Sequence, residues 1–129
     1  MRWRIMAVLF VTLPSAAMAQ TVLGTMSVAT FLAKVDALAA KGPWAAFSSD
    51  LSLLKNEVAY GGQTYRQQLK SEAAAGRPSS CPPPRAPFSS DDVIAQMKTY
   101  SVGNRQHVTV STAVADLFRK RYPCRAIKP

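Results

Sequence analysis

The sequence predicts a small all-α protein. Apolar residues recur every three or four positions in four segments of the 129-residue chain, which is the spacing of one buried face on a helix. Residues that favour the start and the end of helices flank these segments, and none of them shows the alternation of a strand. We therefore expect a single-domain bundle of about four helices, with one disulfide between a proline-rich hinge and the end of the last helix.

Residues 1–19 have the pattern of a secretory signal peptide. Arg2 and Arg4 precede a short apolar run, Ile5 to Leu13, and Ala17-Met18-Ala19 has the small-x-small form that signal peptidase recognises. A membrane anchor is the alternative, but a spanning helix needs about 20 apolar residues. We expect cleavage after Ala19, a periplasmic location, and one helical domain over residues 20–129.

Two helices are predicted before the hinge. The first lies between Thr25 and Pro43, with Ser27 as its N-cap and a stop at Gly42-Pro43; its apolar stripe is Val28, Phe31, Leu32, Val35, Leu38 and Ala39. The second runs to Gly76 and starts either at Pro43 or near Ser48, Ser49 or Asp50; its stripe is Trp44, Phe47, Leu51, Leu54, Val58, Tyr65 and Leu69. Gly61 and Gly62 inside it indicate either close approach of a neighbouring helix or a kink or break.

The hinge, residues 77–88, contains many prolines and cannot be helical. It should be extended and exposed. Cys81 lies in it, and Cys124 is the only other cysteine. In an exported chain these two cysteines are expected to form a disulfide, worth about 4 kcal/mol for a loop of this length. Metal ligation is the alternative, but it requires further ligands at short spacing.

Two shorter helices are predicted after the hinge. In the first, Ser89 and Asp92 match a capping box, and Asp91 and Asp92 suit the helix N-terminus; its apolar face is Val93, Ile94, Met97 and Tyr100. In the second, Thr109 is the expected cap and Pro123 the stop; its stripe is Val110, Ala113, Val114, Leu117, Phe118 and Tyr122.

No catalytic set is recognisable. His107 is the single histidine and falls in a polar connection, Asp91 and Asp92 are explained as caps, and no serine has a base in a known motif. Trp44 and His107 are the remaining ligand candidates of the exported chain, and neither has partners at ligand spacing. We expect no enzyme, no metal and no cofactor.

The chain is strongly basic. Its formal net charge is +9, and about +7 remains once Arg2 and Arg4 leave with the signal peptide. Arg119, Lys120 and Arg121 are followed by Arg125 and Lys128 near the C-terminus. They could complement the dipole of the last helix or bind an anionic surface such as lipid or cell-wall polymer. Nucleic acid is not expected as a partner of an exported protein.

The motifs resemble those of a known family. The "CPPP" hinge at Cys81, the capped helix after it, the further helix and the terminal "YPC" ending at Cys124 are similar to the Rap/Tai immunity-protein domain of the type VI secretion system. The resemblance covers about residues 81–124 well and the first half more loosely. Tyr60, Gly61 and Gly62 stand where family members carry a Gly-Tyr motif, and the family's further cysteine in this helix is absent.

The resemblance implies a protein partner. Members of the family protect the periplasm by occluding a cell-wall amidase effector, so an immunity-type binding protein is one expectation. A structural or envelope-associated protein that binds an anionic surface, with no toxin partner, is the alternative. Six candidate partner-binding residues follow from the motif and the charge cluster: Tyr60, Gly61, Gly62, Arg119, Lys120 and Arg121.

Overall fold

The structure, a computed structural model, describes residues 22–125 and confirms the all-α fold. The described part contains α1 (Val28–Ala40), a 3-10 helix η1 (Gly42–Phe47), α2 (Ser49–Ala74), α3 (Ser90–Lys98) and α4 (Val110–Arg121). No strand occurs among these residues. The predicted signal peptide and its cleavage site after Ala19 lie outside the described range, and so does Lys128.

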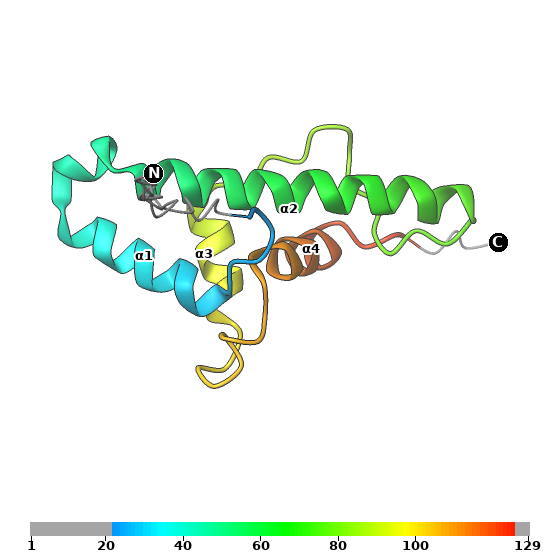
Figure 1. Cartoon of the computed structure of the whole chain (residues 1–129). Helices are drawn as coiled ribbons and strands as arrows, with labels where there is room; N and C mark the ends of the chain where they lie inside the picture. The colour runs from blue at the N-terminus through cyan, green and yellow to red at the C-terminus, as the bar shows by residue number, and fades with distance from the viewer. Residues whose placement is uncertain (1–21, 126–129) are drawn as a thin grey trace, which may run out of the picture.

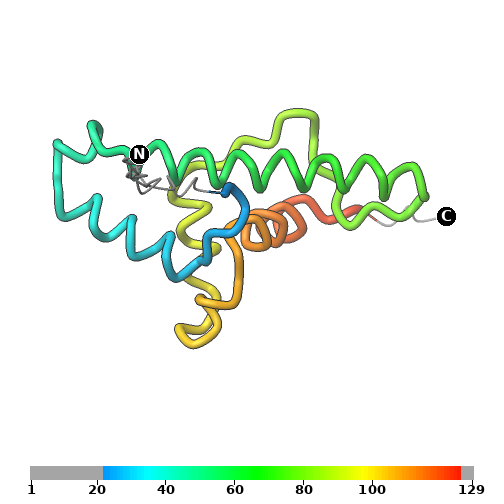
Figure 2. The backbone as a smooth tube through the Cα atoms, in the orientation of Figure 1, coloured from blue at the N-terminus to red at the C-terminus, as the bar shows by residue number. Residues whose placement is uncertain are grey.

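α2 is the axis of the fold (Figure 1). With 26 residues it is the longest helix, about 39 Å from end to end. α4 packs across it in the most extensive helix contact of the molecule, α3 packs on α4, and α1 lies against the N-terminal half of α2. The chain reverses direction at η1, so that α1 and α2 form a hairpin (Figure 2). One core fills the space between these helices.

The predicted helix starts are confirmed in three cases. The side chain of Ser27 accepts the N–H of Thr30 at 3.1 Å, and that of Thr109 accepts the N–H of Thr112 at 3.1 Å. Ser89 and Asp92 form the expected capping box at the start of α3. Each cap satisfies backbone donors that the first helical turn leaves free, so the local sequence fixes where these helices begin.

The second predicted helix has its start at the later of the two expected places. Ser48 is the N-cap of α2, and the residues before it form the separate helix η1 with Pro43 in its first turn. The prediction that Trp44 and Phe47 belong to the buried stripe was wrong, because they are 75% and 84% exposed. Gly42, with a φ of 56°, makes the turn between α1 and η1. Ser48, between η1 and α2, has an extended backbone (φ −80°, ψ 132°), so η1 does not continue the helical path of α2.

The glycine pair does not break α2, which is continuous from Ser49 to Ala74. Gly61 is buried at the crossing with α4, where a Cβ atom would lie 3.0 Å from the Cα of Ser111 and 3.4 Å from the Cβ of Val114. A Cβ atom on Gly62 would meet nothing within 4 Å. Of the two readings left open by the sequence, close helix approach is therefore the right one, and it concerns Gly61 alone.

The Cys81–Cys124 disulfide is confirmed, with Cα atoms 4.9 Å apart. The hinge turns back at the end of α2 and reaches α3 without helix of its own (Figures 1 and 2). The Cys81 N–H also donates to the Tyr122 carbonyl at 2.8 Å. The disulfide and this hydrogen bond together connect the middle of the hinge to the end of α4.

Candidate functional site

Four aromatic rings pack together where α2, the hinge and α4 meet. Phe118 is the centre, with Tyr65 at 5.3 Å and Phe88 at 4.7 Å between ring centroids. Tyr122 completes the group, 5.9 Å from Phe88. The disulfide joins two of these segments, the hinge and the end of α4, and hydrogen bonds from Tyr65 to Ser79 and Ser80 join α2 to the hinge. We call this group of rings the aromatic platform.

Three arginines stack on this aromatic platform. The guanidinium of Arg66 lies 5.4 Å from the ring centroid of Phe118, that of Arg119 lies 5.1 Å from Tyr65, and that of Arg121 lies 5.6 Å from Phe88. A stacked guanidinium keeps its edge N–H groups free to donate while its plane is held against the ring. The platform thus presents oriented cationic donors at the surface.

A shallow groove of about 240 Å³ lies beside this platform, between α2 and α4. We call it the α2/α4 groove. Its wall combines apolar surface with polar side chains, and Arg119 is one of its lining residues; the lining residues are Gly61, Thr64, Tyr65, Gln68, Ser111, Thr112, Ala115 and Arg119. The absence of a side chain at Gly61 brings the two helices together at the floor of the groove.

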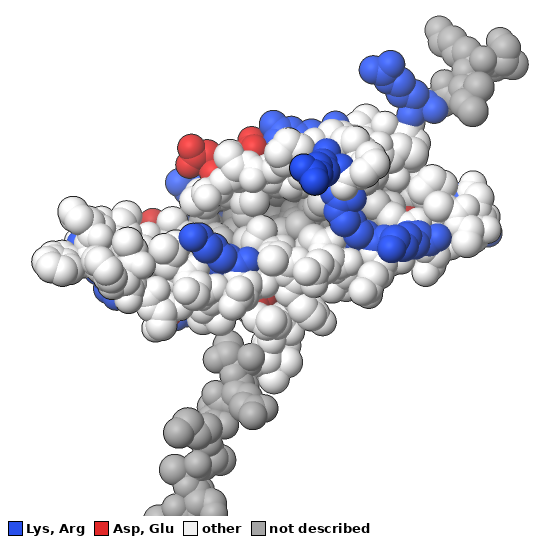
Figure 3. Space-filling model, turned by 90° about the horizontal axis from the view of Figure 1, so that it is seen from above, with Lys and Arg blue, Asp and Glu red and all other residues white. Residues whose placement is uncertain are grey.

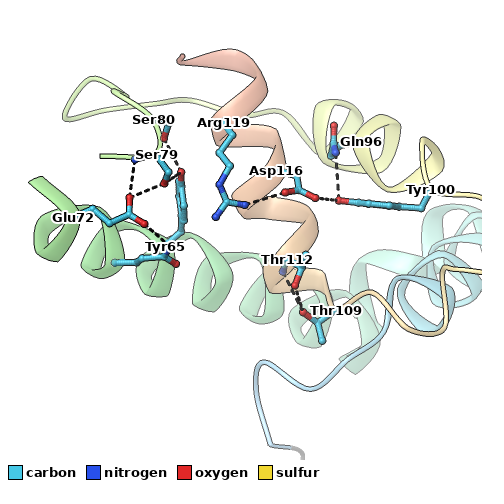
Figure 4. Close-up of polar contacts among 11 residues, drawn as sticks. Tyr65, Glu72, Ser79, Ser80, Gln96, Tyr100, Thr109, Thr112, Asp116 and Arg119 are labelled. Carbon is cyan, nitrogen blue, oxygen red and sulfur yellow. Dashed lines mark hydrogen bonds and ion pairs between the residues drawn. The ribbon is translucent and has the colours of Figure 1, made fainter. Parts of the chain in front are cut away.

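Arg119 is held in place by a chain of hydrogen bonds (Figure 4). It donates to Asp116 at 3.0 Å, and the other carboxylate oxygen of Asp116 accepts the Tyr100 hydroxyl at 2.5 Å. Burial, followed by the bond to Asp116, raises the pKa of Tyr100 to about 12. Asp116 is thus oriented from both sides, and it fixes the guanidinium over the ring of Tyr65.

The opposite wall of the groove is braced by the start of the hinge. The Tyr65 hydroxyl hydrogen-bonds Ser80 at 2.8 Å and Ser79 at 3.0 Å, and Ser80 is buried. Glu72 accepts the N–H of Ser79 at 2.7 Å and a proton of the Gln68 amide at 2.6 Å. The hydrogen bonds from Ser79, with that from Gln68, lower the pKa of Glu72.

Ser111 is the unsatisfied polar group of the groove. Its hydroxyl oxygen is buried and has no hydrogen-bond partner among the described residues. It faces Gly61 across the helix crossing. Most buried polar atoms in proteins are paired, so this hydroxyl is an exception, enclosed at the helix crossing.

A second depression, of about 260 Å³, lies between α3 and α4. Its lining includes Lys120 and Arg121 together with Asp92 and Gln96. Arg121 donates to both oxygens of Asp92, at 3.0 and 3.3 Å. The bond from the Ser89 N–H, followed by that from Arg121, lowers the pKa of Asp92 to about 2.

The carboxylates of the protein are largely occupied by its own groups. All seven acidic residues lie in the described range. Five of them have hydrogen-bonding partners within the chain: Asp50, Glu57, Glu72, Asp92 and Asp116. The described range holds 13 lysines and arginines, since Arg2, Arg4 and Lys128 fall outside it. Only three of these cations, Lys34, Arg119 and Arg121, form ion pairs there.

The remaining ten cations leave the surface basic. Figure 3 shows the molecule from the side of α2, where lysine and arginine side chains are prominent and few acidic groups are visible. Lys55 and Lys70 are exposed on α2, and Arg77 and Arg85 are exposed in the hinge. The acidic surface of a partner would be attracted to these cations and would meet few carboxylates that repel it.

The six predicted partner-binding residues do not form one site. Gly61 and Arg119 line the α2/α4 groove, whereas Lys120 and Arg121 line the depression between α3 and α4. Tyr60 covers Gly24 instead, because a Cβ atom at Gly24 would overlap the Tyr60 ring. Gly62 lies in neither depression.

Sequence reasoning missed Glu57. Its side chain is fully buried, and both carboxylate oxygens accept the N–H of Gly24, at 3.0 and 3.2 Å. Glu57 falls between Leu54 and Gly61 on the buried face of α2, three and four residues away. A charged residue at a core position of a helical stripe was the available signal, because such a group requires a partner.

No group of three or more His, Cys, Asp or Glu side chains in residues 22–125 is placed to hold a metal ion. His107 is exposed and its ring contacts the Gln106 amide at 3.2 Å. Within the same range no helix has the length and apolar character needed to cross a membrane.

Comparison of the chain with protein-family models, with curated proteins and with solved structures gave no match.

Proposed function

We propose that this protein is an exported binding protein whose α2/α4 groove receives an acidic segment of a partner protein. The observation that carries the proposal is the fixed orientation of the Arg119 guanidinium at the groove. Stacking on Tyr65 and the bond to Asp116 fix its guanidinium before any partner arrives, and only one donor atom is used by the carboxylate. A pre-oriented arginine loses little side-chain freedom on binding and is a frequent centre of protein interfaces.

The other groups around the groove support the same kind of ligand. Thr64 on α2 and Thr112 on α4 line the groove with exposed side chains that carry hydroxyl groups. These groups can donate hydrogen bonds to carboxylate or carbonyl oxygens, and the cationic surface nearby attracts an acidic chain. The groove is shallow and about 240 Å³ in volume, which suits a loop of a protein better than an enclosed small molecule.

The partner class we propose is a cell-wall amidase effector acting in the periplasm. This part of the proposal is supported by the resemblance of the hinge and of the terminal motif at Cys124 to the Rap/Tai immunity domain. A disulfide-fastened platform is consistent with work in an oxidising compartment. The protein would act by covering the amidase's active site, without chemistry of its own.

Co-expression tests this function. Each cell-wall amidase encoded by the same genome is directed to the periplasm, with and without this protein, and lysis is followed by culture turbidity. We expect protection against one of them and binding of the purified pair by calorimetry. Intact mass of the periplasmic protein should show a chain beginning at Gln20. Lysis unchanged for every amidase, or a chain that still begins at Met1, would contradict the proposal.

Two neighbouring positions on α2 provide a matched pair of variants. Thr64 lines the groove and Gln63 does not, although both are exposed. Thr64→Glu places a carboxylate where we expect the partner's acidic segment and should weaken binding by about tenfold or more. Gln63→Glu makes a similar change of net charge outside the groove and should have little effect. Equal effects of the two variants would show that the groove is not the binding site.

A further inference from the structure

The hairpin formed by α1, η1 and α2 carries an exposed aromatic pair that is separate from the α2/α4 groove. The ring centroids of Trp44 and Phe47 lie 6.3 Å apart, and both side chains are mostly exposed. Residues three apart in a 3-10 helix eclipse each other, so η1 presents both rings on one side. Large apolar side chains exposed next to each other mark a contact surface.

The surroundings of this pair are apolar with a cationic edge. Between Ala37 and Ser49 the only charged residue is Lys41, which is exposed. The next carboxylate along the chain, Asp50, is bonded to Lys34 at 2.8 Å, and that bond lowers its pKa. We call Lys41, Pro43, Trp44, Ala46 and Phe47, all exposed, the η1 tip.

We infer that the η1 tip docks on the surface of an anionic phospholipid bilayer. Tryptophan beside lysine is the combination favoured at the interface between headgroups and acyl chains. The net charge of residues 22–125, with 13 cations and seven carboxylates, adds attraction to anionic lipid. The tip lies where the chain reverses at one end of the molecule, so it can approach a flat surface before the rest of the protein does (Figure 2).

A second copy of this chain is a poorer occupant for the tip. Two aromatic side chains can bury at most about 300–500 Å² on each copy. A stable dimer buries about 1,200–2,000 Å² in total, so tip-to-tip contact alone falls short. Binding to a bilayer needs no such area, because the apolar area buried by the tip and the attraction of the net charge to anionic lipid act together.

Tryptophan fluorescence tests this inference. Trp44 is the only tryptophan once residues 1–19 are removed, and Trp3→Phe gives the same reporter in the full chain. We expect a blue shift of Trp44 emission with vesicles of phosphatidylethanolamine and phosphatidylglycerol mixed about two to one, and quenching by lipids with brominated acyl chains. Vesicles of phosphatidylcholine alone should give much weaker binding, and added salt should weaken binding to the anionic vesicles.

Phe47→Ser and Val102→Ser form the variant pair. Each removes an exposed apolar side chain, 84% and 79% exposed, but Val102 lies in the connection between α3 and α4. We expect Phe47→Ser to weaken vesicle binding about tenfold and Val102→Ser to leave it unchanged. Thr64→Glu changes the α2/α4 groove and not the η1 tip, so it should alter vesicle binding little. Vesicle binding therefore tests the tip separately from the proposed groove.

Three results would overturn the inference. Trp44 emission could be unaffected by anionic vesicles, or Phe47→Ser could bind them as well as the parent. Sedimentation could show a dimer that Phe47→Ser dissociates, which would make a second copy the occupant. Loss of amidase binding in Phe47→Ser, with no vesicle binding by the parent, would assign the tip to the protein partner.

Discussion

Gly61 of α2 and Ser111 of α4 stand so close that a Cβ atom on the glycine would lie 3.0 Å from the Cα of the serine. This crossing sets the distance between the two helices that make the largest contact in the molecule. It also forms the floor of the α2/α4 groove. The relationship makes Gly61 a packing residue, and any effect on partner binding would pass through the helix spacing.

Alanine should stabilise the protein at Gly62 but not at Gly61. Gly62→Ala adds a methyl group in open space and should stabilise the protein by about 0.5–1 kcal/mol through helix propensity. Gly61→Ala gains the same propensity but presses on the backbone of α4, so it should be less stable than Gly62→Ala by about 1–3 kcal/mol. Urea unfolding measures both. Equal stability of the two variants would contradict this account of the crossing.

Loss of the disulfide should lower stability without changing the fold. Cys81→Ser, Cys124→Ser and the double variant should each lose about 2–5 kcal/mol, since each opens the same loop. The melting temperature of all three should fall by a similar amount. Peptide mapping without reductant should recover the cross-linked pair in the parent. Parent-like melting of the double variant would show that the hydrogen bond from Cys81 to Tyr122 and the aromatic packing hold the hinge unaided.

Much of this fold could be predicted because its signals are local. Ser27, Ser89 and Thr109 cap helices through side chains that lie three residues before the N–H groups they bind. Periodicity predicted most of the buried faces of α1, α3 and α4 for the same reason, but the prediction that Ala39 belongs to the buried stripe was wrong, because Ala39 at the end of α1 is exposed. The disulfide was predictable because the chain contains only two cysteines.

The errors have a common physical origin. Trp44 and Phe47 continue the spacing of the α2 stripe, yet the extended backbone of Ser48 and the 3-10 geometry of η1 take them off its face. Glu57 lies at a core position of the α2 stripe, but a charged side chain is not expected there. Its hydrogen-bond partner, the Gly24 N–H, lies 33 residues away, so no local pattern indicates the pair. The assembly of Arg119, Tyr65 and Asp116 depends on how α2 crosses α4, which no local pattern encodes.

Glu57 should act as the anchor of the segment before α1. Glu57→Ala removes the acceptor of the Gly24 N–H and should cost about 1.5–3 kcal/mol, whereas Glu57→Gln keeps an amide oxygen there and should cost less. Hydrogen exchange should show that the Gly24 amide loses protection in Glu57→Ala. Protection of that amide equal to the parent's would mean that packing of Tyr60 holds the segment by itself.

The contacts of Asp92 predict a loss of stability in acid. Its pKa falls from 3.8 to about 2 in the folded protein, so the contribution of this carboxylate is complete above about pH 4 and is lost as the pH falls through 2. Asp92→Asn should therefore be less stable than the parent at neutral pH, and the difference should shrink between pH 4 and pH 2. Urea unfolding across this range measures the difference. Asp91→Asn, at the exposed neighbouring position, is the control, and a pH-independent difference for Asp92→Asn would contradict the prediction.

The bond between Tyr100 and Asp116 predicts the opposite dependence in alkali. Folding raises the pKa of Tyr100 from 10.0 to about 12, first through burial and then through the neighbouring carboxylate. The folded state thus favours the protonated phenol, so its contribution is complete below about pH 10 and is lost as the pH rises through 12. Tyr100→Phe should remove this alkaline loss. In the absorbance titration of the four tyrosines, the parent should show a late component that Tyr100→Phe lacks and that Asp116→Asn moves to lower pH.

Asp116→Asn also removes the ion pair of Arg119, so amidase binding should fall in this variant while Tyr100→Phe, which leaves the ion pair in place, should retain it. Equal binding by both variants would mean that Asp116 does not position Arg119 for a partner.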